Sequence, residues 1–193
     1  VYAGQSFMSF QWDILLLEVG FLAMFFAPAR LWGKSPPSAI VVWLFRFLVF
    51  RLMFGSGYMK LASGDETWRS LSALDFHYFT QPLPNPIAWF AHQLPAWIDH
   101  TSVFLMFAIQ LILPFFIFAP RRLRFFAAGC FIFLELLIGL TGNYTFFNLL
   151  TIGLILLLFD DQFFRAEFVL RPKQPHTHTQ TKEQRWIPRV LAA

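Results

Sequence analysis

The feature that most constrains this chain is a series of long hydrophobic runs, most of them ended by proline or by charged residues. A transmembrane helix needs about 20 mainly apolar residues, and five runs approach that length: residues 10–27, 39–59, 101–118, 123–140 and 144–159. We therefore expect an all-α fold, a multi-pass transmembrane helical bundle of about five membrane helices with one long extramembrane loop. Several runs are short, so some helices are expected to tilt or to cross incompletely.

The composition agrees with a lipid environment. Of the 193 residues, 57% are hydrophobic and 13% are charged, and Phe alone contributes 27 residues. Soluble domains are about a quarter charged, and apolar surface on this scale exceeds what one small soluble core can bury. The net charge of +4 does not indicate nucleic-acid binding, because the basic residues lie mostly between the hydrophobic runs and in the tail.

Basic and less basic connections alternate along the chain. Basic residues follow the first, third and fifth runs: Arg30, Lys34, Arg121, Arg122, Arg124, Arg165, Arg171 and Lys173. Because cytoplasmic loops carry the excess of Lys and Arg, we expect an outside N-terminus, an outside loop between the second and third runs, and an inside tail. If the fifth run is re-entrant, the tail lies outside instead.

Composition divides the chain into two parts. Residues 1–165 form the expected bundle, which includes an extracytoplasmic segment with short helices that we call the long loop (residues 62–100). Residues 166–193 form a polar tail, rich in Pro, Thr, His and Gln, which we expect to be disordered. The single cysteine, Cys130, excludes an intramolecular disulfide.

Charged residues also lie within the hydrophobic runs: Asp13, Glu18, Arg46, Arg51 and Glu135. One charge at the bilayer centre costs about 2.5–3.5 kcal/mol, so we expect these residues to pair inside the bundle. Glu18 is expected to pair with Arg46 or Arg51, and Glu135 is the other candidate partner. The alternative for Asp13 and Arg51 is a position close enough to a helix end to reach the interface. The charges indicate either a polar cavity or substrate site or ion pairs that fix helix order.

The long loop is the most informative polar segment. Asp65 is placed to cap a short helix that contains Trp68, and residues 77–86 read His-Tyr-Phe-Thr-Gln-Pro-Leu-Pro-Asn-Pro. Alternate prolines force an extended backbone of low entropy, which suits a partner-docking strip. The alternative is a rigid connector that caps the bundle, with residues 87–94 along the membrane surface. The candidate client-binding residues are Asp65, Trp68, His77, Tyr78, Gln81, Pro82, Pro84, Asn85 and Pro86.

No motif in the sequence indicates catalysis or metal binding. The histidines of the long loop and Asp75 lack a His-x-x-x-His or Cys–His spacing, and the P-loop, GxGxxG and GxSxG patterns do not occur. We therefore predict no metal, no cofactor and no catalytic residues.

Six groups of residues carry a family resemblance. They are Phe10-Gln11-Trp12-Asp13 with Glu18 and Gly20, Arg51 to Gly57 with Lys60-Leu61, Gly64-Asp65 with Trp68 and Leu71, His77-Tyr78 with Thr80 to Pro86, Thr141 to Tyr144 with Phe147-Asn148, and Asp160-Asp161. In this order they resemble the lipase maturation factor family, and the proline string is the most specific part. The match covers the chain from about Phe10 to Asp161.

The resemblance implies a multi-pass protein of the endoplasmic reticulum membrane, or of the inner membrane if the chain is bacterial. It implies a role in the folding and maturation of secreted lipases or other exported clients, through a lumen-facing loop that resembles the long loop here. It supplies no catalytic residues. We expect the family's earlier membrane segments and its large C-terminal soluble region to be missing or cut away in this chain.

A second function class stays open. The arginine-rich second run, followed by Gly55, Gly57 and Lys60-Leu61, is similar to DoxX-like proteins and to the membrane part of vitamin K-dependent carboxylase. This similarity implies a membrane redox or carboxylase-like enzyme module that uses buried Arg and Glu residues. The partners expected from the sequence are the lipid bilayer and an exported protein client, such as a secreted lipase, with no nucleic acid.

Overall fold

The computed structural model describes residues 10–27, 36–81, 85–142, 144 and 146–168 of the chain. Within these ranges every regular element is a helix, and no strand occurs. The chain divides into two compact units after Phe159, and each unit is described by itself. The predicted all-α fold is confirmed.

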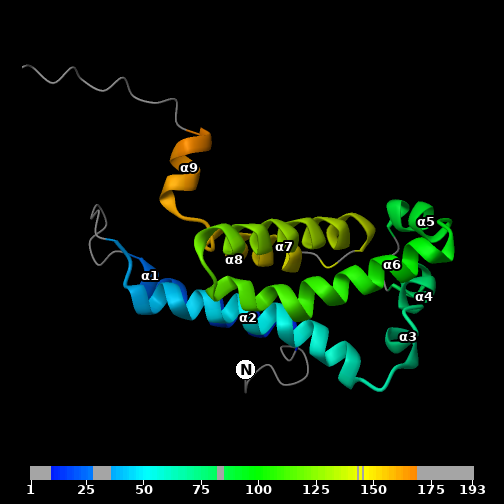
Figure 1. Cartoon of the computed structure of the whole chain (residues 1–193). Coiled ribbons are helices and arrows are strands. Elements are labelled where there is room, and N and C mark those ends of the chain that lie inside the picture. The colour runs from blue at the N-terminus through cyan, green and yellow to red at the C-terminus, as the bar shows by residue number, and fades with distance from the viewer. Residues whose placement is uncertain (1–9, 28–35, 82–84, 143, 145, 169–193) are drawn as a thin grey trace, which may run out of the picture. The chain divides into compact units, whose positions relative to one another are not determined.

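Three helices in the described part are long and apolar enough to cross a membrane (Figure 1). α2 (Ala39–Ala62) has 24 residues, α7 (Arg121–Thr141) has 21, and α6 (Ala96–Phe107) continues without a break into a third span of 23 residues. Two of the five expected membrane helices are shorter, since α1 (Gln11–Phe26) has 16 residues and α8 (Phe147–Leu156) has 10. The multi-pass helical bundle is confirmed, with three helices of full spanning length.

The third span changes its helical form halfway. α6 gives way to a π-helical turn, η2 (Ala108–Ile112), and then to a 3₁₀ helix, η3 (Leu113–Phe118). Pro114 lacks a backbone N–H, so the α-helical hydrogen-bond pattern cannot continue through it. Gln110 lies on the π turn, packs against Gly57 of α2 and is only 3% exposed. A polar side chain is thereby placed in the interior of the bundle.

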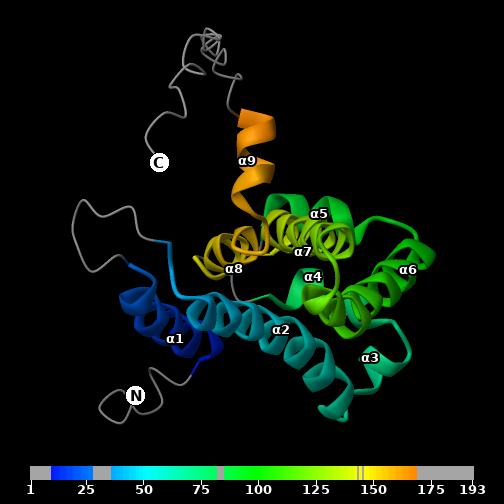
Figure 2. The same ribbon diagram turned by 60° about the vertical axis from the view of Figure 1, so that its left-hand side comes forward.

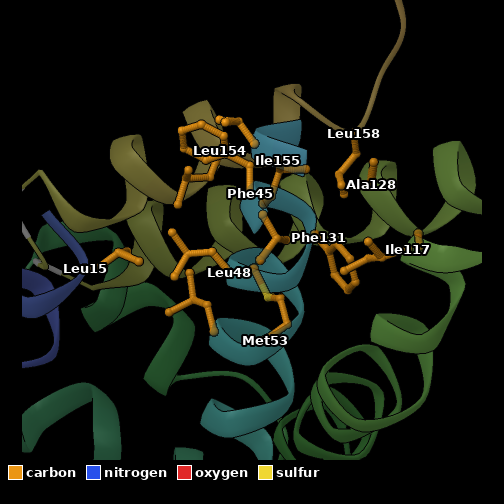
Figure 3. Packing of buried hydrophobic residues seen from close by; sticks show 14 residues of the cluster. Leu15, Phe45, Leu48, Met53, Ile117, Ala128, Phe131, Leu154, Ile155 and Leu158 are labelled. Carbon is orange, nitrogen blue, oxygen red and sulfur yellow. The ribbon is translucent and has the colours of Figure 1, made fainter. Parts of the chain in front are cut away.

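The core of the first unit forms around α2, which packs against α1, η2, η3 and α8. Figure 3 shows Met53 of α2, Phe131 of α7, Ile117 of η3 and Ile155 of α8 in one cluster. Each of these side chains is at most 1% exposed. Close packing of large apolar side chains therefore holds the spans together.

The outer faces of the same helices carry large apolar side chains that stay exposed. The most exposed of those on the membrane helices include Phe21, Ile40, Phe47, Phe126, Phe133 and Leu149, each more than half accessible. A contiguous apolar surface of this kind makes a protein associate in water, whereas bilayer hydrocarbon solvates it. The chain is an integral membrane protein.

The long loop is helical over much of its length. α3 (Glu66–Arg69), α4 (Ala73–Thr80) and α5 (Pro86–His92) gather where α2 ends and α6 begins (Figures 1 and 2). We call this the loop end of the bundle. The end at which α2 and α7 begin is called the arginine end.

Polar side chains start two of these short helices. Oδ1 of Asp65 accepts a hydrogen bond of 2.9 Å from the backbone N–H of Thr67, and the hydrogen bonds from Thr67 lower the pKa of Asp65. Oδ1 of Asn85 accepts a bond of 2.9 Å from the N–H of Ile87, with Pro86 at the first helical position. Because helices of this length are marginal alone, the caps help to fix the conformation of the loop.

The second unit contributes one described helix, α9 (Asp161–Phe168). Oδ1 of Asp160 accepts a hydrogen bond of 3.1 Å from the backbone N–H of Phe163 at its start. The disorder expected for residues 166–193 concerns a segment that lies almost entirely outside the described residues, and it stays a prediction.

Candidate functional site

The long loop is attached to the last turn of α7. Nε2 of Gln81 donates a hydrogen bond of 2.9 Å to the carbonyl of Thr141, and Nδ2 of Asn85 donates one of 3.4 Å to the carbonyl of Gly142. Carbonyls at a helix C-terminus lack donors within the helix, so the loop side chains satisfy them. Gln81 and Asn85, the described residues on either side of positions 82–84, are therefore both attached to the end of α7.

A second attachment joins α4 to Tyr144, which lies in the connection between α7 and α8. The hydroxyl of Tyr144 lies 3.4 Å from Nε2 of His77, and the two rings stack with centroids 6.4 Å apart. Burial lowers the pKa of His77, and the positive charge of Lys60 lowers it further, so the imidazole is neutral at pH 7. Burial also raises the pKa of Tyr144. An uncharged His–Tyr contact therefore closes this side of the loop.

A cavity of about 220 Å³ lies beneath the long loop. It is bounded by α2, α4, η2, α7 and the start of α8, and its polar lining includes Ser56, Lys60, His77, Gln110, Glu135 and Asn148. Nζ of Lys60 donates to Oε1 of Gln110 at 3.1 Å and to the carbonyl of Ser56 at 3.2 Å. The same nitrogen lies 5.4 Å from the ring centre of Trp68, which adds a cation–π contact.

Glu135 is the acidic group of this cavity and is only 6% exposed. Its Oε2 accepts a hydrogen bond of 2.8 Å from Nδ2 of Asn148, which also lies 3.3 Å from the backbone carbonyl of Glu135. Between the residues that the structure describes, no direct ion pair joins Glu135 to Lys60. The partner of Glu135 is thus an amide on α8, whereas an arginine on α2 was the expectation from the sequence.

The guanidinium of Arg51 contacts the carboxylate of Glu18, which is one of the two pairings expected. Their side chains remain 52% and 32% exposed, so the pair lies on an outer face of α1 and α2, not in the interior. Arg46 and Arg51 are five positions apart and point about 140° away from each other on the helix. One glutamate therefore cannot serve both arginines. Asp13 lies in the first turn of α1, where the helix dipole favours an acidic group.

Arg46 is the remaining charge within the spans. Its Nε is buried without a hydrogen-bond partner, and its guanidinium lies 5.7 Å from the ring centre of Trp43. The described part of the chain offers it no carboxylate within ion-pair distance. Arg46 thus belongs to neither the cavity nor the Glu18–Arg51 pair.

The other candidate residues of the long loop differ in exposure. Trp68 and Tyr78 are half-buried, and burial raises the pKa of Tyr78 to about 12. Pro86 is exposed at the start of α5. Pro82 and Pro84 lie outside the described residues, so their part in a docking strip stays a prediction.

Sequence reasoning did not single out four polar residues of the cavity as site residues: Lys60, Gln110, Tyr144 and Asn148. Each is a single polar group within or beside an apolar run, and hydrogen-bond partners such as Lys60 and Gln110 are 50 positions apart. No local spacing pattern connects them. The available signal was that isolated polar residues in apolar helices tend to face one another in the bundle.

Comparison with known proteins gives a consistent set of relatives. A family model described as the lipase maturation factor transmembrane domain matches residues 1–166. Lipase maturation factor 2 of Gallus gallus is 46% identical over 195 residues, which cover 98% of this chain and 26% of that protein. The same factor of Xenopus laevis is 52% identical over 165 residues, with 82% and 23% covered. Lipase maturation factor 1 of Mus musculus is 42% identical over 165 residues, with 83% and 29% covered.

The chain therefore spans about a quarter of the length of the curated relatives that it matches. No solved structure matches it.

Proposed function

This chain belongs to the lipase maturation factor family, and we propose that it assists the folding and maturation of secreted lipases or other exported proteins in the endoplasmic reticulum membrane. In this proposal the long loop faces the lumen and contacts the client. The observation that carries it is a set of aromatic side chains that the loop and the start of α6 leave exposed on a firmly attached support.

We call this set the aromatic platform, and each member is between 51% and 68% exposed. Its members are Phe76, Phe79, Trp89, Phe90 and Trp97. A ring contact connects two of the helices that carry these residues, since the ring centres of Phe79 on α4 and His92 on α5 lie 5.2 Å apart. Incompletely folded clients expose apolar segments, and large aromatic side chains bind such segments through their area.

The support of the platform is preorganised. The hydrogen bonds of Gln81 and Asn85 to the end of α7, together with the His77–Tyr144 contact, hold α4 and α5 before any client arrives. A surface that is already ordered loses less conformational entropy when it binds. An ordered platform is therefore better suited to bind a client than a disordered loop would be.

A secretion assay tests the proposal in cells that need this protein to export an active lipase. We expect the double variant F79A/F90A to lose most of the lipase activity in the medium while it still inserts into the membrane. The matched control is F126A/F133A on α7, where two phenylalanines are each 58% exposed on a spanning helix. The control should keep the activity, because those residues face lipid.

A platform that only touches the membrane surface, where aromatic residues are also common, gives a different result. In that case F79A/F90A lowers membrane association or protein level and leaves the activity per molecule unchanged. Either that result or equal losses in both double variants would contradict client binding by the long loop.

The cavity beneath the loop favours a second candidate function, a membrane enzyme. Four ionisable groups, those of Lys60, His77, Glu135 and Tyr144, meet in one partly enclosed space, which is an arrangement found in active sites. Arg46 and Arg51, which the sequence suggested for such chemistry, are not among the residues that line it.

The conservative variant E135Q separates the two candidates. It keeps the size of the side chain and an oxygen that accepts the bond from Asn148, but it removes the carboxylate. The folding-helper proposal predicts that lipase export by E135Q equals that of the wild type. Loss of export in a variant that is stable and correctly inserted would favour the enzyme.

A further inference from the structure

The arginine end of the bundle holds two basic residues without an acidic partner. Arg46 comes from the first half of α2, and Arg124 comes from the first turn of α7. Within the described ranges neither guanidinium has a carboxylate in ion-pair distance. Both lie beside η3, since Trp43 next to Arg46 stacks on Phe118, the last residue of η3, and α7 begins three residues later. Charges with no counter-charge are unfavourable in surroundings of low polarity.

Fixed contacts keep Arg46 in this position. Its guanidinium lies 5.7 Å from the ring centre of Trp43, and that ring stacks on Phe118 with centroids 5.5 Å apart. Its Nε is buried and has no hydrogen-bond acceptor. A buried donor without an acceptor is costly, so the side chain is placed but not satisfied by the described residues.

Arg124 is held in a similar way. Its Nε donates a hydrogen bond of 2.9 Å to the carbonyl of Leu158, and its guanidinium lies 5.5 Å from the ring centre of Phe125. Only one of its five N–H groups is used by this hydrogen bond. Two guanidinium groups from different helices are therefore held on either side of the end of η3, and both have N–H groups without a partner among the described residues.

We propose that the phosphate group of an anionic lipid binds between Arg46 and Arg124. The planar guanidinium group matches phosphate oxygens and donates to them in pairs. By the distribution of basic residues, the arginine end faces the cytoplasm, and the cytoplasmic leaflet carries the anionic lipids. Basic pockets between transmembrane helices on that side bind such headgroups.

The surroundings of the two arginines favour a lipid over a free anion. Trp43, which contacts Arg46, and Phe118, which stacks on Trp43, are 52% and 41% exposed on the outer face of the bundle. This apolar surface would pack against acyl chains, while the phosphate neutralises the arginines. A soluble phosphate would gain only the second of these interactions.

Thermal unfolding in nanodiscs tests the proposal. The chain is compared in phosphatidylcholine alone, in phosphatidylcholine with phosphatidylinositol, and in phosphatidylcholine with added inorganic phosphate. We expect phosphatidylinositol to raise the Tm of the wild type. Native mass spectrometry should show that this lipid binds about tenfold more tightly to the wild type than to R46Q or R124Q. R122Q is the matched control, since it removes the same charge from an exposed position in the same turn of α7.

The direction in which R46Q changes the Tm in neutral lipid gives an independent check. Without an anionic lipid, R46Q should unfold at the same Tm as the wild type or a higher one, because it removes an unpaired charge. This outcome also shows that the variant folds. R124Q also loses the hydrogen bond to the carbonyl of Leu158, so it is compared for lipid binding and not for the Tm in neutral lipid. The proposal is overturned if phosphatidylinositol does not stabilise the wild type, if R122Q loses as much as R46Q, or if inorganic phosphate alone gives the whole shift.

Discussion

The charged residues of the cavity at the loop end and the arginines at the other end differ in their hydrogen-bond partners. At the loop end, Lys60 and Glu135 each have a polar partner from another helix, Gln110 and Asn148 respectively. At the arginine end, Arg46 has a buried Nε without an acceptor. Lys60 and Glu135 therefore find their partners within the described chain, although Oδ1 of Asp99 and Nδ1 of His92 at the same end are buried without one. Arg46, by contrast, needs a counter-charge from outside.

This difference leads to a general expectation about the stability of variants. Removing one polar partner at the loop end should destabilise the fold, because it leaves a buried group unsatisfied. Removing Arg46 at the other end should not do so in neutral lipid, because its Nε has no hydrogen bond to lose. The following changes test that asymmetry and the packing on which it depends.

The largest effect is expected at Gly57, where α2 and η2 come closest. A Cβ at this position would lie 2.9 Å from Cβ of Gln110 and 2.9 Å from Cδ2 of Leu111. G57A should therefore push η2 away from α2 and lower the free energy of unfolding by about 3 kcal/mol, the upper end of the usual range for overpacking. Reversible unfolding in mixed detergent micelles measures this change.

Gly55 provides the control on the same helix, because a Cβ there meets nothing within 4 Å. G55A should leave stability unchanged or raise it by up to about 1 kcal/mol, since alanine favours a helix. Equal effects of G55A and G57A would show that the close approach of α2 and η2 is not what holds the loop end.

A smaller loss is expected for N148L, which removes the donor to the buried carboxylate of Glu135. An unsatisfied buried group costs about 1–3 kcal/mol, and this range includes relaxation of the site. The double variant E135L/N148L should recover most of the loss, because both polar partners are then gone. A double-mutant cycle measures the coupling, and additive effects of the two changes would argue against the pairing.

The smallest effect is a pH dependence at His77. Burial and Lys60 place the pKa of His77 in the folded protein below the ordinary value of 6.5, so the unfolded chain takes up the proton first as the pH falls. The contribution to stability is complete above the ordinary pKa and is lost as the pH falls below it, until the folded state is also protonated. In H77Q this part of the pH profile should be absent, and an unchanged profile would show that His77 is not its source.

The sequence allowed the spans to be predicted because long apolar runs carry their own signal. The runs at residues 39–59 and 123–140 correspond closely to α2 and α7. The run at residues 144–159 gives only a ten-residue α8, followed by tighter turns. Hydrophobicity alone does not show where helical hydrogen bonding stops.

The site was less accessible to sequence reasoning. The pairing of Glu18 with Arg51 was one of two options, and only the direction of each side chain on α2 separates them. The contacts of Lys60 with Gln110 and of Glu135 with Asn148 depend on the π turn at η2 and on the packing of α8 against α7. Those are tertiary features, and no spacing along the chain encodes them.

Sidedness is the central claim, since the client proposal needs the long loop in the lumen and the lipid proposal needs the arginine end in the cytoplasm. Single-cysteine variants L94C and R122C, made in a C130A background, can be labelled in sealed microsomes with a membrane-impermeant maleimide. The account predicts that position 122 is labelled in intact vesicles and position 94 only after permeabilisation. Labelling of position 94 in intact vesicles, with protection of position 122, would contradict it.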